Sequence, residues 1–155
     1  MRNRKEAAIR SVLLENYQSY YRLAFSYVHN EADAMDIVQE GAYKAMTNAS
    51  SLRDVGYAGT WVYRIIINTA KDYLKKYERE REMLEEDVAV AKGSDMNIEI
   101  WEVISHLPER EKTIIILRFY EDKSLTEIAE IMQENLSTVK SRLYRTLKKL
   151  RSELG

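Results

Sequence analysis

Apolar side chains recur at helical spacing through the first half of the chain. In residues 6–28 they stand three or four positions apart, which predicts one amphipathic helix, with Ile9, Leu13, Tyr17, Tyr20, Leu23 and Tyr27 directed inward. Asn30 is a candidate N-cap with Asp33 at the third helical position, so a second helix is expected from there to about Met46. Residues 47–57 have little periodicity and are expected to form a loop.

A third helix is expected to begin near Ala58, and its two faces differ. One face is apolar and directed inward, with Trp61, Val62, Ile65, Ile66, Thr69, Tyr73 and Leu74. The other face carries a polar, mostly basic stripe at steps of three or four residues: Arg64, Asn68, Lys71, Asp72, Lys75 and Arg79. This helix can therefore pack on one side and present charged side chains on the other.

The second half of the chain predicts shorter helices. An acidic stretch that ends near Gly93 and Ser94 precedes it, and this composition predicts a linker over residues 81–96. Pro108 suits the first turn of a helix, and Ser124 with Glu127 has the pattern of a capping box. The expected helices cover residues 96–106, 108–120, 125–132 and 137–154.

Composition narrows the fold class. Five glycines and one proline in 155 residues leave few turns, so we expect an all-α protein. Its two small helical domains would span residues 1–80 and 97–155, joined by a flexible linker at 81–96. The chain has no cysteine, no apolar run long enough for a membrane span and no signal-peptide pattern, so a cytoplasmic location is expected. We expect no metal site and no cofactor, because the two histidines are far apart in the sequence and lack nearby ligand partners.

Residues 124–151 have the pattern of a helix-turn-helix. A short capped helix, a break at residues 133–135 and a longer basic helix follow one another, and a small core between the helices is expected from Ile128, Ala129, Met132, Val139 and Leu143. The break contains no glycine, so we expect Asn135 to take the left-handed or capping conformation there. Residues 137–151 include six basic side chains and no acid, which favours an anionic partner although the whole chain has a net charge of −1.

The side of the last helix opposite that core carries the candidate DNA contacts, namely Thr138, Ser141, Arg142, Tyr144, Arg145 and Lys148. Arginine can bind guanine bidentately in the major groove, and lysine can neutralise a phosphate. The alternative is a solvated basic face on a terminal helix. The capped helix at the correct distance before it favours DNA binding.

Three motifs resemble the extracytoplasmic-function (ECF) sigma factors of the sigma-70 family. The resemblance to sigma region 4 lies in four segments: Leu107-Pro-Glu-Arg-Glu-Lys, Leu117-Arg-Phe-Tyr-Glu, Leu125-Thr-Glu-Ile-Ala-Glu-Ile-Met and Thr138-Val-Lys-Ser-Arg-Leu-Tyr-Arg. Region 2.2 is resembled by Asp33-Ala-Met-Asp36-Ile-Val-Gln39-Glu40, and region 2.4 by Trp61-Val-Tyr-Arg64-Ile with Asn68-Thr-Ala-Lys-Asp72-Tyr-Leu. The motifs stand in the family's order and cover roughly residues 15–80 and 97–152. The resemblance implies a sigma factor that directs promoter-specific transcription initiation by bacterial RNA polymerase.

The resemblance also implies which residues bind which partner. The region 2.2 match would dock on the clamp helices of the polymerase β′ subunit through Asp33, Asp36, Gln39 and Glu40. The region 2.4 match would read the −10 element through Asn68 and Asp72 and hold its backbone through Arg64, Lys71 and Lys75, and Ser51 and Arg53 are candidates for lining a base pocket. The region 4 match would read the −35 element beside the polymerase β flap, and it adds Lys140 to the contacting face.

Further partners follow from the same resemblance. ECF sigma factors are typically held inactive by an anti-sigma factor, often membrane-anchored, until a stress releases them. We expect no stable homo-oligomer and no catalytic activity. Three alternatives remain open at this point: a dimeric helix-turn-helix regulator that acts without polymerase, a small nuclease, and a sigma-like adaptor that binds polymerase without initiating transcription.

Overall fold

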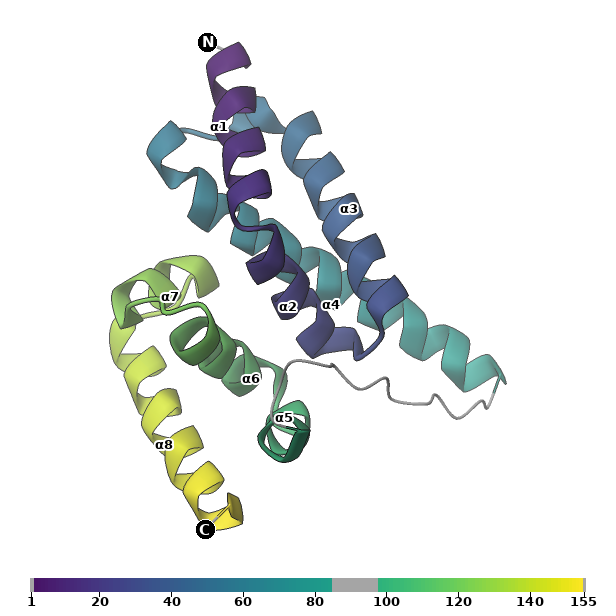
Figure 1. The fold of residues 1–155 in the computed structure, drawn as a ribbon, viewed down its shortest axis with the longest axis vertical. Coiled ribbons are helices and arrows are strands. Elements are labelled where there is room, and N and C mark those ends of the chain that lie inside the picture. The colour runs from purple at the N-terminus through teal and green to yellow at the C-terminus, as the bar shows by residue number, and fades with distance from the viewer. Residues whose placement is uncertain (1, 85–97, 155) are drawn as a thin grey trace. The chain divides into compact units, whose positions relative to one another are not determined.

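The structure is a computed structural model that describes residues 2–84 and 98–154, and every regular element in these two ranges is helical (Figure 1). Internal contacts divide the chain into two compact units, Met1–Ala91 and Lys92–Gly155. The expected all-α fold with two small helical units is therefore confirmed. Within the described ranges, no helix is long and apolar enough to cross a membrane.

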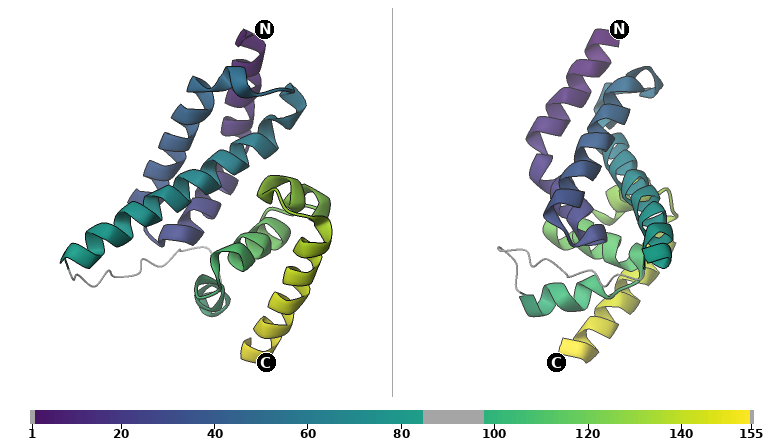
Figure 2. Two further views of the ribbon diagram at one scale, coloured as in Figure 1. Left: turned by 180° about the vertical axis from the view of Figure 1, so that it is seen from behind. Right: turned by 90° about the vertical axis from the view of Figure 1, so that its right-hand side faces the viewer.

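In its described residues, the first unit contains four α-helices: α1 (Arg2–Glu15), α2 (Tyr17–Val28), α3 (Glu31–Thr47) and α4 (Ala58–Leu84). Helices α2, α3 and α4 pack against one another, and α1 packs against α3 and α4 (Figure 2). The core contains Ile9, Tyr20, Leu23, Ile37, Val62 and Ile66, which are all fully buried. The ring of Tyr20 meets that of Tyr63 edge to face at 4.8 Å between centroids, which adds a directional contact to this core.

The helix predicted over residues 6–28 is interrupted, so this prediction is wrong at one position. Asn16 separates α1 from α2 with φ −112° and ψ 20°. Asparagine competes with helical backbone bonding through its own side chain, which makes it a natural place for such a break. The change of direction also leaves Tyr17 44% exposed instead of in the core.

The boundaries on either side of α4 also differ from expectation. The predicted loop at 47–57 contains two short 3₁₀ turns, η1 (Ala49–Ser51) and η2 (Val55–Tyr57), and Asp54 caps the second by accepting from the Gly56 N–H at 2.8 Å. Helix α4 continues to Leu84, four residues into the stretch predicted as a linker. The rest of that linker, residues 85–96, lies outside the described residues.

Gly41 sets the distance between α3 and α4. A Cβ added at Gly41 would come within 2.6 Å of Ile66 Cδ1, which is closer than real carbon contacts allow. Ile66 is itself fully buried, so its side chain has little room to move. The missing side chain of Gly41 therefore allows the two helices to pack closely.

The second unit contains α5 (Ile98–Ser105), α6 (Glu109–Ile115), α7 (Leu125–Met132) and α8 (Leu136–Leu154). Helix α8 packs against α5, α6 and α7. Ile128, Ala129, Val139 and Leu143 are buried as predicted between α7 and α8, whereas Met132 is only partly buried. The core of the unit also includes Ile131 and Thr146, which the sequence pattern did not single out.

The helix predicted over residues 108–120 changes its winding halfway, so that prediction is only partly right. Pro108 is the N-cap of α6, and residues 116–120 form a π-helical turn, η3 (Ile116–Tyr120), in which the Glu121 N–H donates to the Ile116 carbonyl at 3.0 Å. A π turn contains one more residue than an α turn and so rotates the residues that follow it. Phe119 is 56% exposed on this turn.

The break of the helix-turn-helix has a defined geometry: the left-handed conformation expected at Asn135 belongs to Gln133, whereas Asn135 takes the N-cap position of α8. Gln133 is left-handed, with φ 56° and ψ 46°. The Glu134 N–H donates to the Ala129 carbonyl at 3.0 Å and the Gln133 N–H to the Glu130 carbonyl at 3.3 Å, which is the Schellman pattern for ending a helix. The Asn135 carbonyl accepts from the Val139 N–H, the first backbone bond of α8.

The packing at Gly41 yields a test of the fold. Gly41→Val is expected to destabilise the first unit by about 2 kcal/mol, because overpacking a tight core costs about 1–3 kcal/mol. Urea unfolding would measure this through tryptophan fluorescence in a Trp101→Phe background, where Trp61 is the single tryptophan. Gly59→Ala is the matched control, since nothing lies within 4 Å of a Cβ there. It should leave stability unchanged or raise it by up to about 1 kcal/mol. Equal effects of the two substitutions would contradict the assigned role of Gly41.

Candidate functional sites

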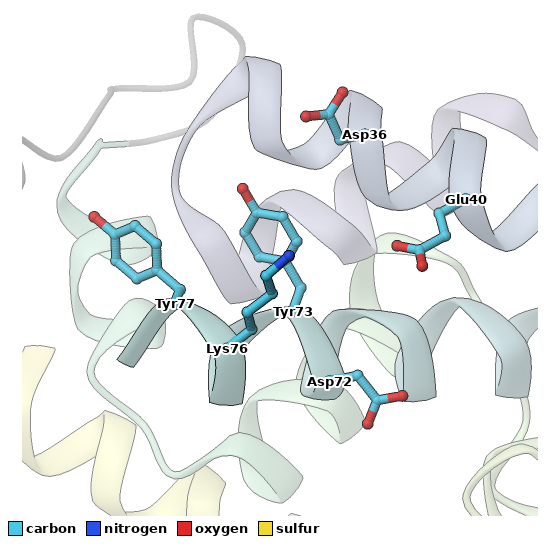
Figure 3. A pocket seen from close by; sticks show the side chains of 6 residues that line it. All are labelled: Asp36, Glu40, Asp72, Tyr73, Lys76 and Tyr77. Carbon is cyan, nitrogen blue, oxygen red and sulfur yellow. The ribbon is translucent and has the colours of Figure 1, made fainter. Parts of the chain in front are cut away.

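An acidic pocket of about 400 Å³ lies between α3 and α4. It is lined by Asp36 and Glu40 from α3 and by Asp72, Tyr73, Lys76 and Tyr77 from α4 (Figure 3). Tyr73 and Lys76 are directed toward α3, whereas Asp72 points away from Asp36. Three carboxylates against one ammonium group make this acidic pocket suited to a cationic partner.

Tyr73 connects the two walls of the acidic pocket. Its hydroxyl donates to Asp33 Oδ1 at 2.5 Å, and the Asp33 N–H donates to the Asn30 side chain at 3.0 Å, the N-cap bond that the sequence predicted. Burial, followed by this bond to a carboxylate, raises the pKa of Tyr73 well above its usual value. The hydroxyl is therefore protonated at neutral pH and fixes Asp33 against α4.

The residues predicted to bind polymerase share one side of α3. Asp36, Gln39 and Glu40 are exposed, while Asp33 is half-buried by its contact with Tyr73. Glu40 also lies 3.7 Å from Lys44, an exposed pair that contributes little to stability. The structure thus brings Asp36 and Glu40 together with two residues that the sequence analysis did not single out for binding, Lys76 and Tyr77.

The polar stripe of α4 reaches the surface at the five positions whose side chains the structure describes. Asn68, Asp72 and Lys75 are exposed, and Arg64 and Lys71 are half-buried. Asp72 belongs both to this stripe and to the acidic pocket. Ser51 ends η1, which packs against α1, and Arg53 follows it in the chain; both residues are exposed. Their role in a base pocket stays a prediction.

The DNA-contact face predicted on α8 is largely solvent-accessible. Lys140, Ser141, Tyr144, Arg145 and Lys148 are exposed, while Thr138 and Arg142 are half-buried. The first turn of α8 contains no acidic residue, which leaves its positive end free of a competing carboxylate of its own. A pocket of about 430 Å³ beside this face is lined by Pro108, Glu109, Arg110, Glu111, Arg142 and Arg145.

Helix α7 is fixed in front of α8 by its capping box, as predicted. The Ser124 N–H donates to Glu127 Oε1 and the Glu127 N–H donates to Ser124 Oγ, each at 3.1 Å. The bonds from Ser124 lower the pKa of Glu127. Two backbone groups at the start of the helix are thereby satisfied within the motif.

The turn between α7 and α8 holds a carboxylate that the sequence analysis missed. Glu134 Oε1 lies 2.8 Å from Arg110 Nη1 on α6 and 3.6 Å from Arg142 Nη1 on α8. The Glu134 side chain is only 13% exposed. No local pattern brings residues 110, 134 and 142 together, because the contact depends on the packing of three helices.

Comparisons with known proteins identify the family. Residues 13–80 match the family of sigma-70 region 2, and residues 97–150 match the family of sigma-70 region 4. The chain is 44% identical to RNA polymerase sigma factor SigV of Bacillus subtilis, covering 96% of this chain and 92% of that protein. It is 30% identical to the ECF RNA polymerase sigma-E factor of Haemophilus influenzae, covering 93% and 86%.

Two solved structures have the same fold. The sigma factor RpoE of Bartonella quintana, solved with the anti-sigma factor NepR, aligns with a TM-score of 0.78 at 22% identity, covering 94% of this chain and 95% of that one. CnrH, solved with the cytosolic domain of CnrY, aligns with a TM-score of 0.74 at 19% identity, covering 99% and 96%.

The chain belongs to the ECF sigma factors of the sigma-70 family. It directs promoter-specific initiation of transcription by RNA polymerase.

The capping box generates a prediction for the second unit. Ser124→Ala should destabilise it by about 1 kcal/mol, the usual effect of losing a cap. Glu127→Gln keeps a neutral capping bond but removes the charge. Because the folded pKa of Glu127 is lowered, the charge stabilises the unit above the unfolded pKa of about 4.3 and stops doing so as the pH falls through the folded value.

Unfolding of the second unit can be followed by Trp101 fluorescence in a Trp61→Phe background. The wild type should be more stable than Glu127→Gln near neutral pH, and the two should converge in acid. A constant difference down to about pH 3 would show that the charge of Glu127 does not act through the cap.

Proposed function

We propose that three surfaces divide the work of this sigma factor. The exposed face of α8 reads the −35 element, the polar stripe of α4 with the η1 turn binds the −10 element, and the acidic pocket binds the polymerase clamp. The observation that carries the proposal is the geometry of α7 and α8. The capped helix α7 packs against the buried side of α8. The opposite side of α8 presents five exposed polar or basic residues.

For α8, the chemistry of the residues supports direct reading of bases. Arg142 and Arg145 can each donate two hydrogen bonds to guanine, and Lys140 and Lys148 can neutralise phosphates. Ser141 and Thr138 are short enough to bond to base edges or phosphate near the start of the helix. Tyr144 is 63% exposed and can lie against the sugar-phosphate backbone.

For the first unit, charge separates the two proposed partners. Asn68 can bond to base edges, while Arg64, Lys71 and Lys75 supply positive charge for the backbone of the −10 strand. The acidic pocket would repel phosphate, so Asp36 and Glu40, with Gln39 beside them on α3, suit a basic protein helix such as the clamp of the β′ subunit. Asp33 supports that surface through its bond to Tyr73.

Regulation is proposed to come from an anti-sigma factor. The two solved structures with this fold were determined with NepR and with the cytosolic domain of CnrY, which supports a protein partner of this kind. We further propose that this partner is membrane-anchored and that the sigma factor itself works in the cytoplasm beside the polymerase β flap, as a monomer. It acts by binding, without catalysis of its own.

Run-off transcription tests the DNA-binding assignments. Core polymerase with the purified chain should yield specific transcripts from fragments upstream of its own gene. Arg142→Ala should lower the yield about fivefold or more, since one bidentate base contact is worth about 1–3 kcal/mol. Asn68→Ala should lower it in the same direction.

Glu153→Ala, an exposed residue near the end of α8, is the control and should transcribe normally. Polymerase binding without transcripts on a broad promoter library would instead indicate an adaptor. A footprint from the chain alone, without polymerase binding, would indicate a stand-alone regulator.

The acidic pocket predicts the effect of charge reversal on polymerase binding. Asp36→Lys with Glu40→Lys should raise the Kd for core polymerase about tenfold, equivalent to about 1.4 kcal/mol, chiefly by slowing association. Glu15→Lys is the control, because Glu15 is exposed at the end of α1 and does not line the pocket. If Glu15→Lys weakened binding as much as the double reversal, general electrostatics rather than the acidic pocket would be responsible.

A further inference from the structure

Glu134 occupies an unusual place for a carboxylate. It lies in the turn of the helix-turn-helix, its side chain is 13% exposed, and two arginines from different helices approach the same oxygen. Arg110 Nη1 is at hydrogen-bond distance, 2.8 Å, whereas Arg142 Nη1 is at 3.6 Å. The Schellman turn fixes the backbone of Glu134 through its N–H bond to Ala129. The turn and Arg110 therefore hold the carboxylate in place independently of Arg142.

The Glu134 carboxylate orients the side chain of Arg142 without occupying the hydrogen-bond donors of its guanidinium group. A separation of 3.6 Å gives electrostatic attraction but is too long for a hydrogen bond. Among the described residues, the second carboxylate oxygen, Oε2, is buried without a hydrogen-bond partner. The guanidinium of Arg142 thus feels a fixed negative charge and still has its N–H groups to offer.

Arg142 also differs from its neighbours on α8. Its side chain is 22% exposed, whereas Lys140, Ser141 and Arg145 are exposed. An exposed arginine samples many rotamers and loses that freedom when it binds, which weakens binding by about two- to tenfold per side chain. An arginine already confined by a fixed charge loses less.

We propose that Glu134 is a positioning residue that confines Arg142 for base reading, with Arg110 anchoring the carboxylate. The inference rests on the proposed function, in which Arg142 contacts a base of the −35 element. Because a carboxylate near DNA also repels phosphates, Glu134 lowers binding to all sequences while it raises the preference for one. These two effects have opposite signs, which makes them separable.

The test is a selection from a DNA duplex pool randomised over ten base pairs, using the holoenzyme of core polymerase with the full-length chain and sequencing of the bound fraction. Glu134→Gln should bind the whole pool as well as the wild type or better. At one base position, its preference for the favoured base should fall about fivefold, the lower end of what one bidentate contact provides. Arg110→Ala should shift the same position in the same direction, without altering the buried carboxylate itself.

Glu111→Gln is the matched control. Glu111 also pairs with a cation of α8, Lys149, at 3.4 Å, and its side chain is 19% exposed. Its neutralisation removes the same charge close to the same face, so binding to the pool should rise while the preference at every position is unchanged. Circular dichroism of each variant would verify that the helices are intact.

A double-mutant cycle completes the design. On the Arg142→Ala background, Glu134→Gln should change no base preference, since the residue it positions is gone. If Arg142→Ala abolishes the preference at one position and Glu134→Gln leaves it intact, the positioning role is wrong and the proposed function stands. If Arg142→Ala has no effect on any position, or the wild type enriches no sequence, the assignment of Arg142 to DNA reading fails and the positioning role fails with it.

Discussion

Gly41 allows α3 to lie so close to α4 that an added Cβ would meet Ile66 Cδ1 at 2.6 Å. This approach has consequences along both helices. On α3, Asp36 and Glu40 precede Gly41 by five residues and by one, and the close approach brings them over Tyr73 and Lys76, which forms the acidic pocket. It also buries one side of α4, so the polar stripe can only face outward. A small residue in the core thereby determines two surfaces of opposite character on the same pair of helices.

The second unit also combines fixed carboxylates with a basic face. Glu111 and Glu134 are both largely buried, and each pairs with cations of α8. A surface of cations alone would bind any nucleic acid with similar strength, because phosphate contacts carry no sequence information. Carboxylates inside such a surface would reduce that general attraction if α8 binds DNA as proposed. Glu134, which contacts Arg142, would also restrict where that cation can lie.

Local rules predicted much of this structure. Helical periodicity located the helices, and the caps at Asn30 and Ser124 fixed two of their starting points to the residue. The rules failed where the apolar periodicity continues through an interruption. The break at Asn16 and the π turn at Ile116 leave no periodic signal, although asparagine suits a break of this kind. The candidate sites show the same contrast. The polar stripe of α4 and the predicted contact face of α8 each repeat along a single helix, whereas the cluster of Arg110, Glu134 and Arg142 requires three helices in place.

The left-handed residue at the helix-turn-helix break is a glutamine, at φ 56°. A residue with a Cβ pays about 1–2 kcal/mol there relative to glycine, yet the Schellman bonds and the buried residues on both sides hold the turn in place. The shape of the motif thus depends on its hydrogen bonds and its core, and it forms without glycine at the turn. A search pattern that demands glycine at this turn would overlook the motif in this chain and in others built like it. A pattern that combines the capping box with the spacing of the buried positions would find them.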